Sequence, residues 1–224
     1  DKEYVAGLRL GLTTNTQDTT GEVAAERPVS VTRAQLEDVL ARFTGEIDQV
    51  PPMYSAIKIN GQKLYQLARK GQEIERPPRR VTIHELALLE PEDGDWRLRI
   101  RCSKGTYVRA LCHDIGQALG CGGCMSALRR TMAAGFTLAE SRSIEDVQAQ
   151  GEALLSPTDS LFRQYPAYHI AGEQDHRRCL CGNPLAAEGL QPGLYRVYSP
   201  DGAFLCLSRW EAGVLTSEKN FFGA

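Results

Sequence analysis

The sequence predicts an α+β protein in which a mixed or antiparallel sheet with flanking helices precedes a small β-rich domain. Three observations lead to this prediction. Residues 80–103 alternate apolar and polar positions around a hairpin turn, whereas residues 30–45 and 107–120 repeat apolar side chains at helical spacing. Beyond residue 166, short apolar runs are separated by Gly, Pro and Asp-Gly turns. A chain of 224 residues suffices for one large and one small domain.

The first third of the chain reads as a strand, a loop and a helix. Residues 4–12 (YVAGLRLGL) predict a strand, and the Thr, Asn, Asp and Gly of residues 13–23 predict a sizeable polar loop. Residues 30–45 predict an amphipathic helix, because Ser or Thr can cap its start and Gly45 follows its end.

The middle of the chain begins with a diproline and contains two hairpins. Asn60-Gly61 is a turn signal, and a short helix is expected at residues 63–70. Residues 80–92 and 95–103 predict two strands joined by a turn at Glu92 to Asp95. In the second strand one face is apolar and the other is basic, which is typical of a solvent-facing side; the basic residues are Arg97, Arg99 and Arg101.

A helix is expected directly after this strand. Ser103, Lys104 and Gly105 form a turn, Thr106 suits the N-cap, and residues 107–120 repeat apolar side chains at i, i+4 and i+8. Tyr107 and Arg109 therefore lie where a helix N-terminus presents unpaired N–H groups. This placement suggests a site that binds an anion and a nucleic-acid base. It does not identify a particular ligand.

Basic residues are concentrated in two segments, although the whole chain has a formal net charge of -2. Basic residues outnumber acidic ones by five in residues 58–80 and again by five in residues 96–109. Such segments attract polyanions through Coulomb forces and counterion release, although many short basic runs are simply solvated. Charge alone leaves both interpretations open.

The composition indicates a cytoplasmic protein with no membrane contact. No apolar run approaches the roughly 20 residues of a membrane span, and the first residues lack a signal-peptide core. Seven irregularly spaced cysteines predict reduced thiols. Zinc bound by two cysteine pairs is a weaker alternative, because Cys-x-Cys spacing is unusual for zinc and the pairs fall in different predicted domains; the pairs are Cys121 with Cys124 and Cys179 with Cys181.

Four segments in the same order resemble the TruB-type tRNA pseudouridine synthases. They are residues 1–23, 50–71, 79–88 and 105–132, the last reading GTYVRALCHDIGQALGCGGCMSALRRTM. The resemblance extends over about residues 1–155 and implies isomerisation of the T-loop uridine of tRNA (position 55) to pseudouridine. It also implies the T arm of tRNA as partner, a monomer, and neither a cofactor nor a metal.

The chemistry of such enzymes requires a flipped uridine to be stacked and held. By resemblance, Tyr4 stacks on the base, Tyr107 and Leu128 line its pocket, and Arg109 pairs with the catalytic aspartate; Lys104 is a further candidate for substrate binding. Without the resemblance, Tyr4 and Leu128 would be interpreted as core residues, and Arg109 as a surface residue that packs along its own helix. Candidates for RNA-backbone contacts are Lys58, Lys63, Arg69, Lys70, Arg129 and Arg130.

The sequence departs from the family at the nucleophile. The family's aspartate lies in a Gly-x-Leu-Asp-Pro motif before the DKEY segment, and these 224 residues contain no such motif. We therefore expect an N-terminally truncated chain that is inactive alone and leaves Arg109 without its partner. Asp114, on the same predicted helix, is the only carboxylate near Arg109 in the sequence, and we do not assign it as nucleophile.

The remaining residues predict a linker at 156–165 and a small domain at 166–224, which leaves 1–155 as the catalytic-domain portion. The small domain resembles the PUA-like C-terminal domain of the same family. Its exposed basic and aromatic residues could contact RNA but are more often plain surface; they are Arg177, Arg178, Tyr195 and Arg196. The alternative to an isomerase is a non-catalytic tRNA-binding module that helps RNA to fold.

Overall fold

The computed structural model describes residues 1–222 and divides the chain into two compact units. The first unit is Asp1–Ser141, and the second begins at Arg142. Residues 142–155 thus group with the second unit, whereas the sequence prediction assigns them to the first domain. Each unit has its own sheet and its own hydrophobic core.

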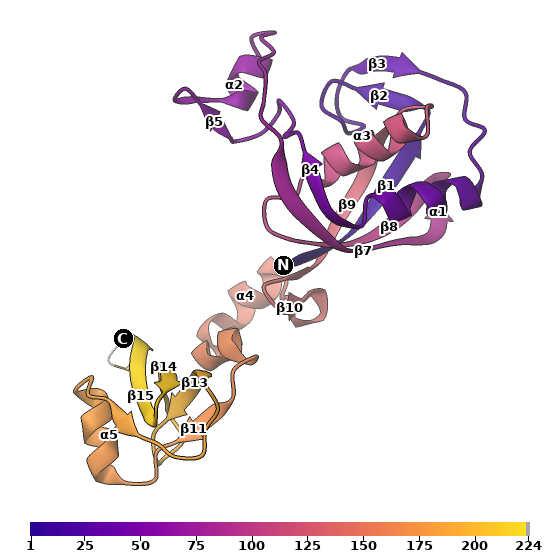
Figure 1. The fold of residues 1–224 in the computed structure, drawn as a ribbon. Coiled ribbons are helices and arrows are strands. Elements are labelled where there is room, and N and C mark those ends of the chain that lie inside the picture. Colours follow the sequence, from indigo (N-terminus) through magenta and orange to yellow (C-terminus); the bar gives the residue numbers. More distant parts are fainter. Residues whose placement is uncertain (223–224) are drawn as a thin grey trace. The chain divides into compact units, whose positions relative to one another are not determined.

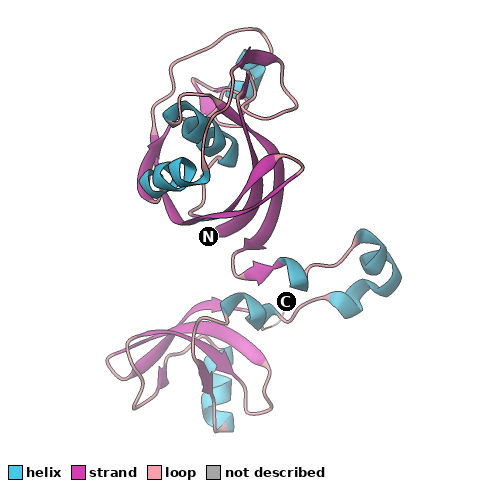
Figure 2. Cartoon of the chain, turned by 90° about the vertical axis from the view of Figure 1, so that its right-hand side faces the viewer, coloured by secondary structure: helices cyan, strands magenta, loops and turns pink. Residues whose placement is uncertain are grey.

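The first unit is built on a six-stranded sheet with the order β10-β9-β1-β8-β7-β4, in which every neighbouring pair is antiparallel. Figure 2 shows the strands curving around helices. The expected hairpin at residues 80–103 is confirmed. The six strands are β1 (Lys2–Leu10), β4 (Gly45–Gln49), β7 (Arg79–Glu92), β8 (Asp95–Cys102), β9 (Gly123–Ala133) and β10 (Phe136–Thr137).

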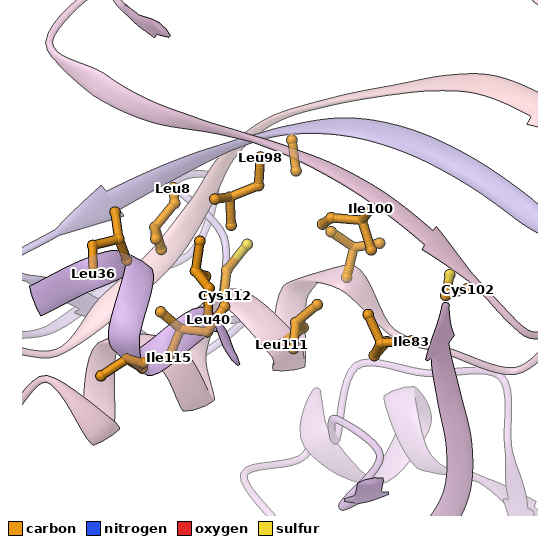
Figure 3. Packing of buried hydrophobic residues seen from close by; sticks show 13 residues of the cluster. Leu8, Leu36, Leu40, Ile83, Leu98, Ile100, Cys102, Leu111, Cys112 and Ile115 are labelled. Carbon is orange, nitrogen blue, oxygen red and sulfur yellow. The ribbon is translucent and has the colours of Figure 1, made fainter. Parts of the chain in front are cut away.

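Helices α1 (Arg33–Arg42) and α3 (Val108–Ala118) pack against one face of this sheet (Figure 1). Their apolar residues interdigitate with those of β1, β7 and β8, as Figure 3 shows for Leu36, Leu111 and Ile115. Burial of these side chains contributes about 25 cal/mol per Å² of apolar area to folding. The core thus holds α3, and with it Tyr107 and Arg109, in a fixed position on the sheet.

The start of α1 agrees with the sequence, whereas the start of α3 does not. Thr32 and Gln35 form a reciprocal capping box at α1, with distances of 2.8 and 3.3 Å. At α3 the N-cap is Tyr107 and not Thr106, whose hydroxyl donates to the Ser103 carbonyl at 3.0 Å. The helix therefore begins one residue later than predicted, and no side chain of its own caps it.

Two short hairpins extend the first unit. Strands β2 (Leu12–Thr14) and β3 (Val23–Glu26) enclose the polar loop of residues 15–22. Strands β5 (Lys58–Ile59) and β6 (Gln62–Lys63) flank the expected Asn-Gly turn and lead into α2 (Leu64–Ala68). Figure 1 shows α2 and β5 away from the main sheet, and they have a small core of their own, formed by Met53, Leu64 and Leu67.

The second unit contains a five-stranded mixed sheet with the order β11-β13-β14-β15-β12. Its turn at Ser199 to Gly202 agrees with the sequence, but residues 173–180 form helix α5 where short strands were expected. The remaining strands are β11 (Ala167–His169), β12 (Leu185–Ala186), β13 (Gly193–Tyr198), β14 (Phe204–Glu211) and β15 (Val214–Asn220). Before these strands the second unit has α4 (Ile144–Gln150) and 3-10 helices at Gly151–Leu154 and Thr158–Phe162, and another 3-10 helix at Leu138–Glu140 lies near the end of the first unit.

Candidate functional site

Arg109, in the first turn of α3, is the centre of a hydrogen-bond network. Its guanidinium donates to the Asp18 carboxylate at 3.0 Å, to the Thr16 carbonyl at 3.2 Å and to the Tyr54 carbonyl at 2.8 Å. These acceptors come from two loops that are distant from α3 in the sequence. The planar guanidinium has donors in a fixed arrangement, so three acceptors hold it in one orientation.

Asp18 is enclosed by donors on both carboxylate oxygens. One oxygen accepts from the Thr16 hydroxyl at 2.8 Å and from the Thr20 hydroxyl and backbone at 2.6 and 3.1 Å, and the other accepts from Arg109. Burial acts to raise the pKa of Asp18, but the hydrogen bonds from Thr20, Thr16 and Arg109 outweigh it, so the net shift is downward. The carboxylate is therefore charged near neutral pH and fixed in place.

The loop that carries Asp18 is attached to strand β9. The Met125 amide donates to the Gln17 carbonyl at 3.0 Å, and the Thr19 amide donates to the Met125 carbonyl at 3.0 Å. Gln17 has a φ of +64°, a left-handed conformation that is uncommon outside glycine and asparagine. The loop thus positions Asp18 between α3 and β9.

Gln49, the last residue of β4, holds the residue at the start of α3. Its side-chain oxygen accepts from the Tyr107 amide at 2.8 Å, and its side-chain nitrogen donates to the Tyr107 carbonyl at 3.1 Å. Gln49 is only 2% exposed. The backbone of a predicted pocket residue is thus fixed by a residue that the sequence analysis did not single out.

Tyr4, Leu128 and Arg130 share one face of the β1/β9 pair. Tyr4 is paired with Arg130 and Ala6 with Leu128, and directly paired residues of antiparallel strands lie on the same face. Leu128 is 47% exposed, so the interpretation as a core residue is wrong. Tyr4 is partly buried against the main core, and burial raises the pKa of its phenol. This face offers an aromatic ring, an apolar side chain and a cation.

Tyr4 lies close to the turn that precedes Tyr107. Besides burial, the thiol of Cys102 at the end of β8 contributes to the raised pKa of Tyr4. Lys104, in the same turn, is exposed, and Gly105 has a φ of +88° that only glycine adopts without strain.

A hollow of about 400 Å³ borders the Arg109 network. Its lining includes Tyr54, whose carbonyl accepts from Arg109, and Gln17, which lies between Thr16 and Asp18, together with Asn15, Arg76 and His113. The hollow is polar and lies between the Asp18 loop, α3 and the segment that carries α2. It is large enough for a small planar ligand group.

The six candidates for RNA-backbone contacts divide into two groups. Lys63 and Arg69 both lie over the ring of Tyr65, at 5.7 and 5.4 Å from its centroid. The adjacent Lys58 and Lys70 are exposed on the same segment. The second group is on β9, where Arg129 and Arg130 are neighbours in the strand and so project to opposite faces.

The basic face of β8 is partly neutralised. Arg97 pairs with Glu92 at 2.9 Å, and Arg99 pairs with Glu85. The expected alternation is present, because Leu98, Ile100 and Cys102 are buried in the core. The interpretation of this stripe as an ordinary solvent face therefore agrees with the structure.

Sequence reasoning missed the partner of Arg109. Asp114 was singled out as the only carboxylate near it in the sequence, whereas the structure pairs Arg109 with Asp18, 91 residues away. Burial raises the pKa of Asp114, and the neighbouring His113 lowers it to a lesser extent. The only local signal at Asp18 is its Thr-rich setting, which in the sequence predicts a polar loop and no more.

The two cysteine pairs of the zinc alternative are divided between the two units. Cys121 and Cys124 belong to the first unit and Cys179 and Cys181 to the second, and residues 1–222 contain no cluster of three or more potential His, Cys, Asp or Glu ligands. All seven cysteines are free thiols. Within the same residues, no helix is long and apolar enough to cross a membrane.

Comparison with family models gives two adjoining matches. Residues 1–108 match the model described as "TruB family pseudouridylate synthase (N terminal domain)". Residues 109–163 match the "tRNA pseudouridylate synthase B C-terminal domain". Together the two models cover the whole of the network around Arg109.

Curated relatives named "tRNA pseudouridine synthase B" are similar along almost the whole chain. The protein of Azoarcus sp. (strain BH72) is 46% identical over 223 residues, which cover 98% of this chain and 74% of the relative. The Chromobacterium violaceum protein is 49% identical over 192 residues, or 84% of this chain and 62% of the relative. The relatives are thus longer than this chain.

Two solved structures share the fold. A chain of "Crystal Structure of a Cbf5-Nop10-Gar1 Complex" aligns with a TM-score of 0.65 and 23% identity, over 99% of this chain and 66% of its own length. A chain of "Structure of H/ACA RNP bound to a substrate RNA containing 2'-deoxyuridine" aligns with a TM-score of 0.64, 21% identity and the same coverage. At these identities the comparison establishes the fold alone.

Proposed function

Because this chain belongs to the TruB family of pseudouridylate synthases, we propose that it is part of an isomerase converting the T-loop uridine of tRNA (position 55) to pseudouridine. The observation that carries the proposal is the fixed guanidinium of Arg109 at the start of α3, the helix that packs against strand β9, which bears Leu128 and Arg130 and pairs with the strand of Tyr4. The reaction breaks the bond from the ribose to N1 of uracil and forms one to C5. The hydrogen of C5 leaves as a proton, and N1 takes up a proton in its place.

In this proposal the uridine is flipped from the T loop and stacks on Tyr4, while Leu128 and Tyr107 line the pocket around it. Base flipping costs a few kcal/mol, and stacking on an aromatic ring returns about 1–3 kcal/mol. The partly buried Tyr4 and the exposed Leu128 suit these roles, since one is held rigid and the other is free to contact a ligand.

Arg109 is proposed to orient the family's nucleophilic aspartate. Its guanidinium already has three acceptors, and a further carboxylate would bind it as a charge-assisted hydrogen bond. Asp18 serves as the permanent anchor of the arginine, because one of its oxygens is held in the loop by Thr16 and Thr20 while the other accepts from Arg109. The nucleophile is the aspartate of the Gly-x-Leu-Asp-Pro motif, which is not among these 224 residues.

The basic residues beside Tyr65 and on β9 are proposed to contact the phosphates of the T arm. For Lys63 and Arg69, the shared position over the ring of Tyr65 supports this role, because it keeps two cations close together. We further propose that residues 1–155 belong to the catalytic domain and residues 166–224 to a PUA-like domain that docks the acceptor arm. The protein acts as a cytoplasmic monomer without a cofactor.

The test measures tritium release from T-arm RNA labelled at uridine C5. The chain is used as it stands and as an extended chain, in which a TruB-family segment bearing Gly-x-Leu-Asp-Pro is joined before Asp1. We expect both to bind the RNA, only the extended chain to release tritium, and Arg109→Ala to slow that release by about 10²–10³-fold. RNA binding by an extended chain that releases nothing would favour the non-catalytic RNA-folding module.

A further inference from the structure

We propose that Gln49 is a positioning residue for the isomerisation: through the backbone of Tyr107 it sets the orientation of the Tyr107 ring and of the Arg109 guanidinium. The inference rests on the proposed function, since it assigns Gln49 to the same site. It begins from the two hydrogen bonds of 2.8 and 3.1 Å that join one buried carboxamide to one distant residue.

The chemistry of the contact is specific to a carboxamide. The backbone of one residue presents an N–H donor and a C=O acceptor, and at neutral pH Asn and Gln offer the complementary acceptor oxygen and donor nitrogen on a single carbon. Gln49 uses both on Tyr107, 58 residues away, and is 2% exposed. A buried amide with both atoms paired fixes the backbone it contacts, because releasing either atom would leave a buried polar group unpaired.

The position of Tyr107 makes this contact consequential. It is the N-cap of α3, with extended angles of φ -100° and ψ 105°, and no side chain caps the helix there. Its carbonyl also accepts the first helical hydrogen bond, from the Leu111 amide at 3.1 Å. Gln49 therefore determines where the chain changes from extended to helical, and Arg109 follows two residues later.

A second contact closes a ring around the site. Arg109 donates to the carbonyl of Tyr54, which follows Gln49 by five residues through Pro51 and Pro52. The prolines restrict this connection, because each has a fixed φ. Segments 49–54 and 107–109 are thus joined at both ends, and a shift of the Tyr107 backbone moves Arg109 against a stiff loop.

The test uses single-turnover tritium release by the extended chain. Gln49→Met keeps the length of the side chain and removes both hydrogen bonds, and a misplacement of about 1 Å at the reacting groups costs on the order of 10²-fold in rate. We expect a loss of that size with RNA affinity changed by less than about twofold. The matched control is Gln117→Met, at an exposed position of α3, and it keeps the full rate.

Gln49→Glu supplies a readout that a purely structural role would not give. A protonated carboxyl can accept from the Tyr107 amide and donate to its carbonyl, as the carboxamide does, whereas the ionised form cannot donate. Burial raises the pKa of a carboxyl placed there, so the rate should recover as the pH falls. Each profile is divided by that of the unmodified chain, which cancels groups common to both, including Asp48, Arg79, Arg80, Arg109 and His113.

The outcomes separate the two proposals. If the unmodified extended chain releases no tritium, the proposed function is wrong. The Gln49 proposal then fails with it, because there is no isomerisation for Gln49 to support. If it releases tritium and folded Gln49→Met is equally fast, only the positioning role is overturned. If Gln49→Met does not fold, Gln49→Glu decides: recovery at low pH relative to the unmodified chain supports the role, and a flat ratio overturns it.

Discussion

The Nη1 atom of Arg109 lies 3.0 Å from the Oδ2 atom of Asp18, and this ion pair joins a loop near the chain's start to the first turn of α3. The side chains are 24% and 14% exposed, so solvent screens the pair less than it screens a surface salt bridge. The ion pair mainly orients the Arg109 guanidinium, because the Asp18 carboxylate that binds it is itself fixed by hydrogen bonds from Thr16 and Thr20.

Removing the charge of Asp18 should slow the reaction more than it weakens RNA binding. Asp18→Asn keeps the shape but loses the ion pair, so the guanidinium becomes less ordered. We expect a rate loss on the order of 10–10²-fold for the extended chain in single-turnover tritium release, and a loss of about 10²–10³-fold for Arg109→Ala. The double variant should lose little more than Arg109→Ala. Additive losses would show that the two residues act separately.

Asp18 should also make stability dependent on pH. Its pKa in the folded protein lies below its value in the unfolded chain, so its contribution is complete above the unfolded pKa of about 4 and is lost as the pH falls through the folded pKa. Urea unfolding at pH 6 and pH 3 measures this contribution as the difference between the unmodified chain and Asp18→Asn. The difference should shrink at pH 3, and a constant difference would contradict the assignment.

Gly116 should tolerate no side chain. A Cβ atom there would lie 2.2 Å from the Gly123 nitrogen and 2.5 Å from the Gly122 carbonyl carbon, which are backbone atoms that cannot rotate away. Alanine gains about 1 kcal/mol of helix propensity, but overpacking exceeds that gain, so Gly116→Ala should cost about 2 kcal/mol net. Denaturant unfolding checks this against Gln117→Ala, expected within about 0.5 kcal/mol of the unmodified chain. Equal stability of the two variants would refute the close contact.

The cations beside Tyr65 and on β9 should contribute to RNA affinity through counterion release. Replacing Lys70 or Arg130 by alanine should reduce the slope of log K against log salt by about 0.7–0.9 each for T-arm RNA. Arg33→Ala is the matched control, because Arg33 already pairs with Glu37 and Glu90. Titrations at three salt concentrations give the slopes, and an unchanged slope would remove that residue from the interface.

One thiol should react rapidly in the native protein. Cys181 is exposed and the other six cysteines are buried, so a thiol reagent should label one group at once and all seven after unfolding. Cys181→Ser should remove the rapid phase. Labelling that increases only after a chelator is added, together with about one equivalent of metal in the purified chain, would support the zinc alternative instead.

The sequence predicts those helices and strands whose ends and spacing are set by residues close together in the chain. The helix at 33–42 and the hairpin at 79–102 follow from capping residues, apolar spacing and a turn signal, all within a few residues. Strand β9 and helix α5 were missed. β9 exposes Leu128, Arg129 and Arg130, which blurs its alternation, and most residues of α5 are polar, which conceals its helical spacing.

The site divides in the same way. Tyr4, Tyr107, Leu128 and Arg109 were found by resemblance, whereas Asp18 and Gln49 were not. Each of these two acts on a residue more than 50 positions away, and each lies in a sequence context that also suits an ordinary turn or strand end. Contacts made only by tertiary folding leave no periodic trace in a single sequence.

The pairing of β1 with β9 is interrupted by irregularities on either side of residues 4–7, and the four pairs between them include Tyr4 with Arg130 and Ala6 with Leu128. Because side chains alternate along a strand, inserting or deleting one residue within 127–130 would turn Leu128 or Arg130 to the opposite face. Natural variation in this segment should therefore consist of substitutions at constant length, and gaps in homologous chains should fall outside the two irregularities.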